Sequence, residues 1–170
     1  MKQTGVTRKI DELGRIVIPK EIRKNLGIRN GEALEIFTNE DSIILKKYFE
    51  VRKYEDLSGK LCELIKNIYN IDLVITDREK VITSSNRNIV ENTRLNNKFL
   101  ELIDNREMFI SRDLSTINFG VDISGYFTVI PIIASSDSLG LVILISEKRI
   151  DYSSLGKFIA KIIADKIDIF

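Results

Sequence analysis

The sequence is 170 residues long, with 44% hydrophobic and 30% charged side chains. That length allows one domain of ordinary size, or a small domain joined to a medium one, and the composition is typical of a globular fold. A single cysteine excludes an internal disulfide framework and a multi-thiolate zinc site. The sequence has no histidine, so it lacks the usual metal ligand and the commonest general base. We therefore expect no metal, no other cofactor and no enzymatic activity.

Hydropathy gives no signal for a membrane or for export. No apolar run approaches the ~18 residues of a membrane helix, and the longest strong run, residues 139–145, has the length of a strand. The first residues, Met-Lys-Gln-Thr-Gly, lack the apolar core of a signal peptide. We therefore expect a cytoplasmic protein with no membrane segment.

The charge is distributed unevenly along the chain. Residues 1–53 hold 12 basic and 8 acidic side chains, a net charge of +4, whereas residues 54–170 hold 14 and 17, a net charge of −3. The excess is concentrated in residues 1–29, with 8 basic and 3 acidic side chains. Such a basic segment indicates a polyanionic partner, although runs of charge are more often only solvated surface.

Residues 1–53 have the pattern of a small β-rich unit. The pattern predicts strands over residues 5–10, 15–18, 33–38 and 42–47, and a helix over residues 20–26. Asp11-Glu12-Leu13-Gly14 suits a tight turn between the first two strands. Pro19 suits the start of the helix, and Gly27 suits its left-handed cap. A unit of about 50 residues without a disulfide or metal buries too little surface to be stable alone, so we expect a homodimer with a shared core.

Residues 54–170 have the pattern of an antiparallel α+β domain. Helices are predicted over residues 57–68, 95–103 and 155–167, and strands over residues 73–77, 81–84, 109–112, 127–134 and 139–146. Residues 48–55 form a charged connector between the two parts. Cys62 lies among apolar residues at helical spacing, which indicates a core residue. The two end helices are apolar on one side, and in such a domain they can lie together on one face of the sheet.

The string Thr4–Lys24, which includes Asp-Glu-Leu-Gly-Arg-Ile-Val-Ile-Pro at residues 11–19, resembles the swapped-hairpin DNA-binding domain of the AbrB family of bacterial transition-state regulators. The resemblance extends from Lys2 to about Tyr48. It implies that two chains exchange hairpins to form one dimeric barrel that binds double-stranded DNA. Together with the longer α+β tail, the chain resembles sporulation regulators of this kind, whose second domain is GAF-like.

The expected fold class is therefore α+β, with an N-terminal domain-swapped β-hairpin barrel (AbrB-like) followed by an antiparallel-sheet GAF-like domain. The expected domains are residues 1–53, for DNA binding, and residues 54–170, for sensing or oligomerisation. The implied function is a sequence-selective, nucleoid-associated transcription regulator of sporulation genes.

The resemblance also implies which side chains contact DNA. By position these are Arg8, Arg15, Arg23 and Lys24. A tight turn brings Arg8 and Arg15 close together, and Arg23 and Lys24 are adjacent on the helix, so two-fold pairing yields a strip of eight cations suited to phosphates and base edges. Because lysine lacks the planar fork of arginine, Lys24 is expected to neutralise phosphate. The alternative is that all four are only solvated surface charges.

The tail leaves two interpretations open. GAF-like domains resemble one another in enclosing a pocket beside the sheet, which implies an unidentified small-molecule ligand beneath a lid at Leu114–Gly125, the longest irregular stretch. The other interpretation is a domain that only mediates association. In either case, pairing of tails from different head dimers would give a homotetramer.

Two other functions compete with DNA binding. The first is an antitoxin with the same head fold, although such antitoxins usually have a short disordered tail, whereas this tail is long and patterned. The second is an enzyme built on the GAF-like domain, which the lack of histidine and of a paired-carboxylate or phosphate-loop motif disfavours.

Overall fold

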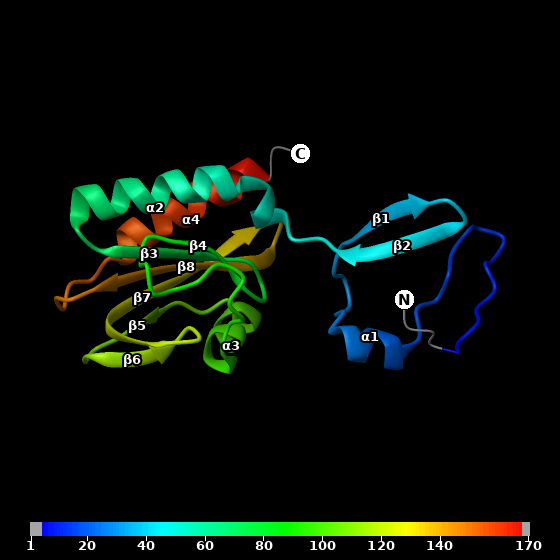
Figure 1. The fold of residues 1–170 in the computed structure, drawn as a ribbon, viewed down its shortest axis with the longest axis horizontal. Coiled ribbons are helices and arrows are strands. Elements are labelled where there is room, and N and C mark those ends of the chain that lie inside the picture. The colour runs from blue at the N-terminus through cyan, green and yellow to red at the C-terminus, as the bar shows by residue number, and fades with distance from the viewer. Residues whose placement is uncertain (1–4, 168–170) are drawn as a thin grey trace. The chain divides into compact units, whose positions relative to one another are not determined.

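The computed structural model describes residues 5–167, and the chain divides into two compact units (Figure 1). We call Met1–Tyr48 the N-terminal unit and Phe49–Phe170 the C-terminal unit. The described residues of each unit combine α-helix with an antiparallel sheet, which confirms the predicted α+β class. Over residues 5–167, no helix has the length and apolarity needed to cross a bilayer.

The second half of the N-terminal unit agrees with the prediction. Its elements are α1 (Lys20–Leu26), β1 (Leu34–Asn39) and β2 (Ser42–Lys47). Gly27 ends α1 at φ +64°, and the amides of Gly27 and Ile28 donate to the carbonyls of Lys24 and Arg23. This cap satisfies carbonyls that the end of a helix leaves without partners, and it depends on a left-handed conformation that glycine adopts without strain.

The predicted strands at residues 5–10 and 15–18 are wrong for this structure. Residues 5–19 form a loop with a turn near residues 12–14, and Figure 1 shows no strand before α1. A strand is stable only when a neighbour pairs with its backbone. Within the described residues, the backbone pairs observed across this loop are Asp11 to Arg15 and Gly14 to Asp11, both of which belong to the turn.

The N-terminal unit has no buried core among residues 5–48, since each of these residues is at least partly exposed. Its large apolar side chains are solvent-exposed instead: Val6, Ile10, Leu13, Ile16, Val17, Leu26, Ile36, Phe37, Ile43 and Leu45. Exposed apolar side chains in such number, on so short a segment, are typical of surfaces that bind another protein.

The C-terminal unit is built on a six-stranded antiparallel sheet. Its elements are η1 (Glu50–Tyr54), α2 (Glu55–Tyr69), β3 (Asp72–Thr76), β4 (Val81–Ser84), α3 (Asn97–Asn105), β5 (Phe109–Ile110), β6 (Ser115–Asn118), β7 (Asp122–Ala134), β8 (Asp137–Ser146) and α4 (Ser153–Ile167). The strand order is β4-β3-β8-β7-β5, and β6 pairs with β7. These elements confirm each predicted helix and, apart from a shorter β5, the predicted strands.

Both faces of this sheet are covered. On one face, α2 and α4 pack over residues such as Leu73 and Ile132, and on the other face α3 packs over residues such as Val74 and Val129. Figure 1 shows α2 and α4 together on one side of the sheet and α3 on the opposite side. The expectation that the two end helices share one face is therefore confirmed.

The predicted lid over Leu114–Gly125 is wrong, because this segment contains β6 and the start of β7, which form a hairpin. Ile117 and Phe119 are 5% and 2% exposed, whereas Thr116 and Asn118 between and beside them are exposed. That alternation fixes the segment on the core beneath α3 rather than above an open pocket.

Residues 49–53, which the sequence groups with the head, fold with the C-terminal unit. Val51 of η1 is fully buried in the core beneath α2 and α4. The adjacent Arg52 donates from Nε to Asp77 at 2.5 Å and from Nη1 to Asn92 at 3.1 Å. Asp77 is 1% exposed and also accepts from the amides of the turn after β3, so the connector is anchored at Val51 and at Arg52.

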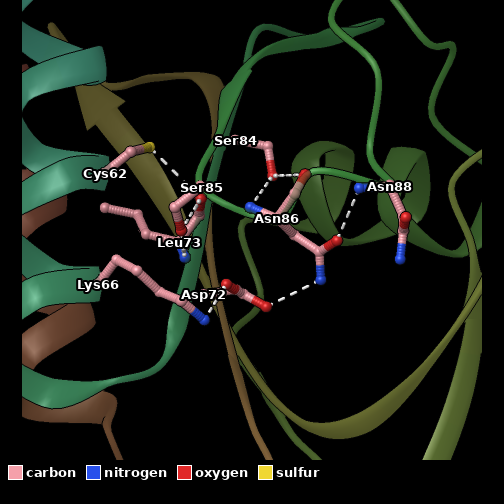
Figure 2. A network of polar contacts seen from close by, with 8 residues as sticks. All are labelled: Cys62, Lys66, Asp72, Leu73, Ser84, Ser85, Asn86 and Asn88. Atoms are coloured by element: carbon pink, nitrogen blue, oxygen red, sulfur yellow. Dashed lines mark hydrogen bonds and ion pairs between the residues drawn. The ribbon is translucent and has the colours of Figure 1, made fainter.

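A polar network joins the end of α2 to the start of β3 (Figure 2). Lys66 donates to Asp72 at 2.8 Å, and the other Asp72 oxygen accepts from Asn86 at 2.8 Å. Cys62 lies beside this network, 2% exposed, with its Sγ 3.3 Å from the Leu73 carbonyl oxygen. Burial raises the pKa of the Cys62 thiol to about 12, so the thiol stays protonated and is a core residue, as predicted.

The close approach of β3 to Gly140 of β8 predicts a strong effect of one added methyl group. An added Cβ at Gly140 of β8 would lie 2.0 Å from the Thr76 carbonyl oxygen of β3. We therefore expect Gly140→Ala to lower the free energy of unfolding by about 3 kcal/mol, the upper range for an overpacked core. Urea denaturation measures this change.

Gly59→Ala in α2 is the matched control, because an added Cβ there meets no atom within 4 Å. Helix propensity predicts a gain of up to about 1 kcal/mol for this variant. A Gly140→Ala protein as stable as the parent would contradict the close approach of β3 and β8.

Candidate nucleic-acid interface

The turn at residues 11–15 determines where two of the candidate cations, Arg8 and Arg15, lie on the chain. The amide of Asp11 donates to the Arg15 carbonyl at 3.1 Å, and the amide of Gly14 donates to the Asp11 carbonyl at 2.9 Å. Gly14 has φ +74°. This is a three-residue hairpin connection with a glycine in the left-handed region, a favoured way to reverse a chain. Arg8 therefore lies on one arm of the turn, and Arg15 begins the other.

The Asp11 carboxylate stabilises this turn and orients Arg15. One oxygen accepts the backbone amides of Arg15 (2.8 Å) and Leu13 (3.0 Å), and the other accepts Arg15 Nε at 2.7 Å. These bonds, led by the Arg15 amide and then its side chain, hold the pKa of Asp11 below its usual range. The Arg15 side chain is 71% exposed, and within the described residues its Nη groups form no hydrogen bond. These groups are therefore donors that an external acceptor could use.

Arg23 is held at a fixed position on α1. Its Nη1 donates to the Asn30 side-chain oxygen at 2.8 Å, and its Nε is buried without a hydrogen-bond partner among the described residues. A buried donor of this kind costs free energy unless a partner group satisfies it. Asn30 therefore acts as a positioning residue, which links the Asn30-Gly31 turn to the helix.

Arg8 and Lys24 are both exposed. Arg8 Nη1 donates to the neighbouring Thr7 carbonyl at 2.9 Å, and the Lys24 ammonium has no hydrogen bond or ion pair within the described part of the chain. Lys24 and Arg23 also lie in the last turn of α1, where positive charge is favoured by the helix dipole. Arg23 and Lys24 are therefore consecutive residues in the last turn of one helix. Arg8 and Arg15 lie on the two arms of one turn.

The sequence predicts the four cations as DNA contacts but does not predict the residues that position two of them, Arg15 and Arg23. Asp11 was expected only as a turn former and Asn30 only as a turn signal, yet each holds a guanidinium. An acidic residue four positions before an arginine, across a predicted turn, was the available signal for Asp11. No group of three or more potential metal ligands occurs in residues 5–167.

Comparison with protein families divides the chain near residue 53. Residues 7–52 match the family described as antidote-toxin recognition MazE, bacterial antitoxin. Residues 54–167 match the family described as stage V sporulation protein T C-terminal, transcription factor. The second match covers most of the C-terminal unit.

Known relatives show the same division. The chain is 34% identical over 155 residues to stage V sporulation protein T of Bacillus subtilis (strain 168), an alignment that covers 88% of this chain and 87% of the relative. It is 60% identical over 48 residues to transition state regulatory protein AbrB of the same organism, which is 28% of this chain and 50% of that relative. The solution structure of the N-domain of the transcription factor abrB, also 60% identical, covers 28% of this chain and 92% of that one, with a TM-score of 0.27.

The Asp11 contacts predict how its ionisation depends on Arg15. Because the carboxyl pKa is lowered in the folded state, its contribution to turn stability is complete above the unfolded pKa and is lost as the pH falls through the folded pKa. We expect Arg15→Gln to raise the Asp11 pKa only part of the way to 3.8, since the backbone amides of Arg15 and Leu13 remain as donors. Carboxyl NMR titration measures the Asp11 pKa in the parent protein and in the variant. An Asp11 pKa that does not change would contradict the ion pair.

Proposed function

Since the chain belongs to the stage V sporulation protein T family of transcription factors, we propose that it is a sequence-selective DNA-binding regulator of sporulation genes. The proposed DNA-binding domain is residues 1–53, of which residues 49–53 form the connector that packs on the C-terminal unit, and residues 54–170 are proposed as a sensing or oligomerisation domain. The proposed location is the cytoplasm, in association with the nucleoid.

The observation that carries this proposal is the set of four cations, Arg8, Arg15, Arg23 and Lys24, on a turn and a helix of the N-terminal unit. Three are guanidinium groups, and two of these are held in place by Asp11 and Asn30 while Nη donors remain available. Oriented guanidinium groups suit the paired acceptors of guanine, whereas the ammonium of Lys24 suits phosphate. The similarity to transition state regulatory protein AbrB, 60% identity over 48 residues, supports the same interface.

We propose that two N-terminal units share one core by exchanging hairpins. The loop at residues 5–19 is closed at its tip by the Asp11 turn, but its apolar side chains Ile10 and Val17 are 65% and 73% exposed. Burying apolar surface of this kind stabilises a complex by roughly 25 cal/mol for each Å² removed from water. Pairing with a second hairpin would also provide backbone partners for the loop and give a swapped barrel with eight interface cations.

The C-terminal unit is proposed to be GAF-like and to join two such dimers. Leu57, Leu61, Leu64 and Ile68 of helix α2 lie at helical spacing and form an apolar strip, in which Leu61 packs against the core. Leu64 and Ile68 are 53% and 69% exposed, and Phe158 of α4 is 64% exposed. Exposed apolar side chains on these two helices favour association with the same face of another chain, so the proposed assembly is a tetramer.

An antitoxin is the second candidate, because the family matched by residues 7–52 has that description. It is the weaker candidate because the C-terminal unit has two buried cores and belongs to a transcription-factor family. Affinity purification separates the two functions. An antitoxin retains a toxin protein in stoichiometric amount, and a regulator retains DNA.

The proposed interface predicts a steep salt dependence of DNA binding. If about six phosphates are neutralised per dimer, affinity should fall by about a thousand-fold as salt rises from about 50 to about 200 mM.

The interface also predicts different effects for its arginines and its lysine. Arg15→Ala or Arg23→Ala should reduce the binding free energy by roughly 1–3 kcal/mol and relax the sequence preference, whereas Lys24→Ala should weaken binding to all sequences alike. Fluorescence anisotropy with operator and scrambled duplexes measures these effects.

Lys60→Ala in α2 is the control variant, since it removes an exposed cation of the C-terminal unit. It should leave DNA affinity unchanged. Wild-type affinity in the arginine variants, with circular dichroism showing intact folding, would reject the assigned interface.

The apolar strip of α2 predicts the effect of charge on assembly. Leu64→Glu combined with Ile68→Glu should convert a tetramer into a dimer, because burying two carboxylates in an apolar contact is costly. Light scattering coupled to size exclusion measures the mass, and Lys60→Glu on the same helix is the control. A parent protein that is already dimeric at micromolar concentration would contradict the proposed tetramer.

A further inference from the structure

One edge of β7 is only partly covered by other strands. β5 pairs with Thr128 and Val129, and β6 pairs with residues 122–125. Among the described residues, no strand pairs with residues 130–134 on that side. α4 packs along β7, and a groove of about 300 Å³ lies between this edge, α4 and the loop after α3. The volume is at the lower limit for small-molecule sites.

The floor of the groove is apolar, and small side chains keep it open. Ala160 and Ala164 lie one turn apart on α4 and line the groove together with Ile130 and Ile133 of β7. One turn earlier, Gly156 brings α4 so close to β7 that an added Cβ would lie 2.6 Å from Ile130 Cγ1. Helix α4 is therefore in tight contact with β7 at Gly156, and Ala160 and Ala164 leave space between the helix and the strand further along.

The rim of the groove is cationic. Arg106, Lys157 and Lys161 line it, and among residues 5–167 no aspartate or glutamate does. Arg106 is exposed in the left-handed cap of α3, at φ +57°, and Lys161 forms an ion pair with Asp165 of its own helix. An apolar floor beneath an excess of positive charge is complementary to a ligand with an apolar chain and an anionic head.

An added β-strand does not fit this edge. The amide and carbonyl of Phe127 face the β5 side, where they bond to Ser111, so Val129 and Pro131 face the same way by the alternation of the strand. Pro131 has no N–H to offer, so the exposed edge lacks a donor at its centre. The occupant is therefore one that binds through the apolar floor and the cations.

We propose that this groove binds a small amphipathic anion, with its chain against Ala160, Ala164 and Ile133 and its head at Arg106 and Lys157. The site lies on the α4 side of the sheet, whereas the sequence placed a ligand beneath the segment Leu114–Gly125. Only the regulatory role of the groove rests on the proposed function. The proposed groove would give the sensing domain a ligand class, a small amphipathic anion.

Octanoate, octylammonium and acetate are the probes, each titrated into the full-length protein by calorimetry and by amide NMR. Octanoate should bind and shift the amides of α4 and of residues 106–108. Acetate lacks the chain and octylammonium has the wrong charge, so neither should bind. Octylammonium binding as tight as that of octanoate would overturn the proposal, and so would the absence of octanoate binding.

Variants locate the site. Ala164→Leu fills the groove, and Arg106→Asn with Lys157→Gln removes two cations while keeping a residue that tolerates the left-handed cap. Each should lower octanoate affinity by about tenfold, whereas Lys60→Gln on α2 should not change it. If Ala164→Leu does not fold, the exposed charge variant decides alone.

Unchanged octanoate affinity in the charge variant would overturn the proposal. The proposal would also be overturned if the charge variant changed the mass of the assembly but left octanoate affinity unchanged. That result would identify a second copy of the chain as the occupant of the groove. DNA affinity is measured separately, so loss of the ligand proposal leaves the proposed DNA-binding function standing.

Discussion

The N-terminal unit has no core of its own, and the proposed function depends on this constraint. Residues 5–48 contain no buried side chain, although apolar residues recur throughout the segment. Local interactions fix only parts of it: the Asp11 turn, the Gly27 cap and the β1–β2 hairpin. Because turns and caps contribute only a few kcal/mol each, a stable interface requires apolar burial that a single chain does not supply. The proposed exchange of hairpins supplies it and doubles the cations at the same time.

The C-terminal unit has the opposite character. Its sheet is buried on both faces, beneath α2 and α4 on one side and α3 on the other. The connector belongs to this unit through Val51 and the Arg52–Asp77 pair. The chain that follows the proposed DNA-binding domain is therefore packed directly on the core of the C-terminal unit.

Sequence patterns were sufficient where a single chain determines the structure. Helical periodicity gave α2, α3 and α4, and turn residues gave Gly27 and the β1–β2 hairpin. Residues 5–10 and 15–18 were expected as strands because their composition is β-prone, but strand formation needs a partner that composition does not specify. The hairpin at β6 was missed because glycines and polar residues masked the alternation of Ile117 and Phe119. The roles of Asp11 and Asn30 depend on three-dimensional proximity to a guanidinium, which sequence spacing suggests only weakly.

A shared core makes the stability of the N-terminal unit depend on protein concentration. Denaturant unfolding followed by the amide resonances of residues 5–48, over a hundredfold range of concentration, measures this dependence directly. If two chains form one core, the midpoint for these resonances rises with concentration, because association stabilises the folded form by mass action. A midpoint for residues 5–48 that stays constant over the whole range would contradict the shared core and, with it, the proposed two-fold DNA interface.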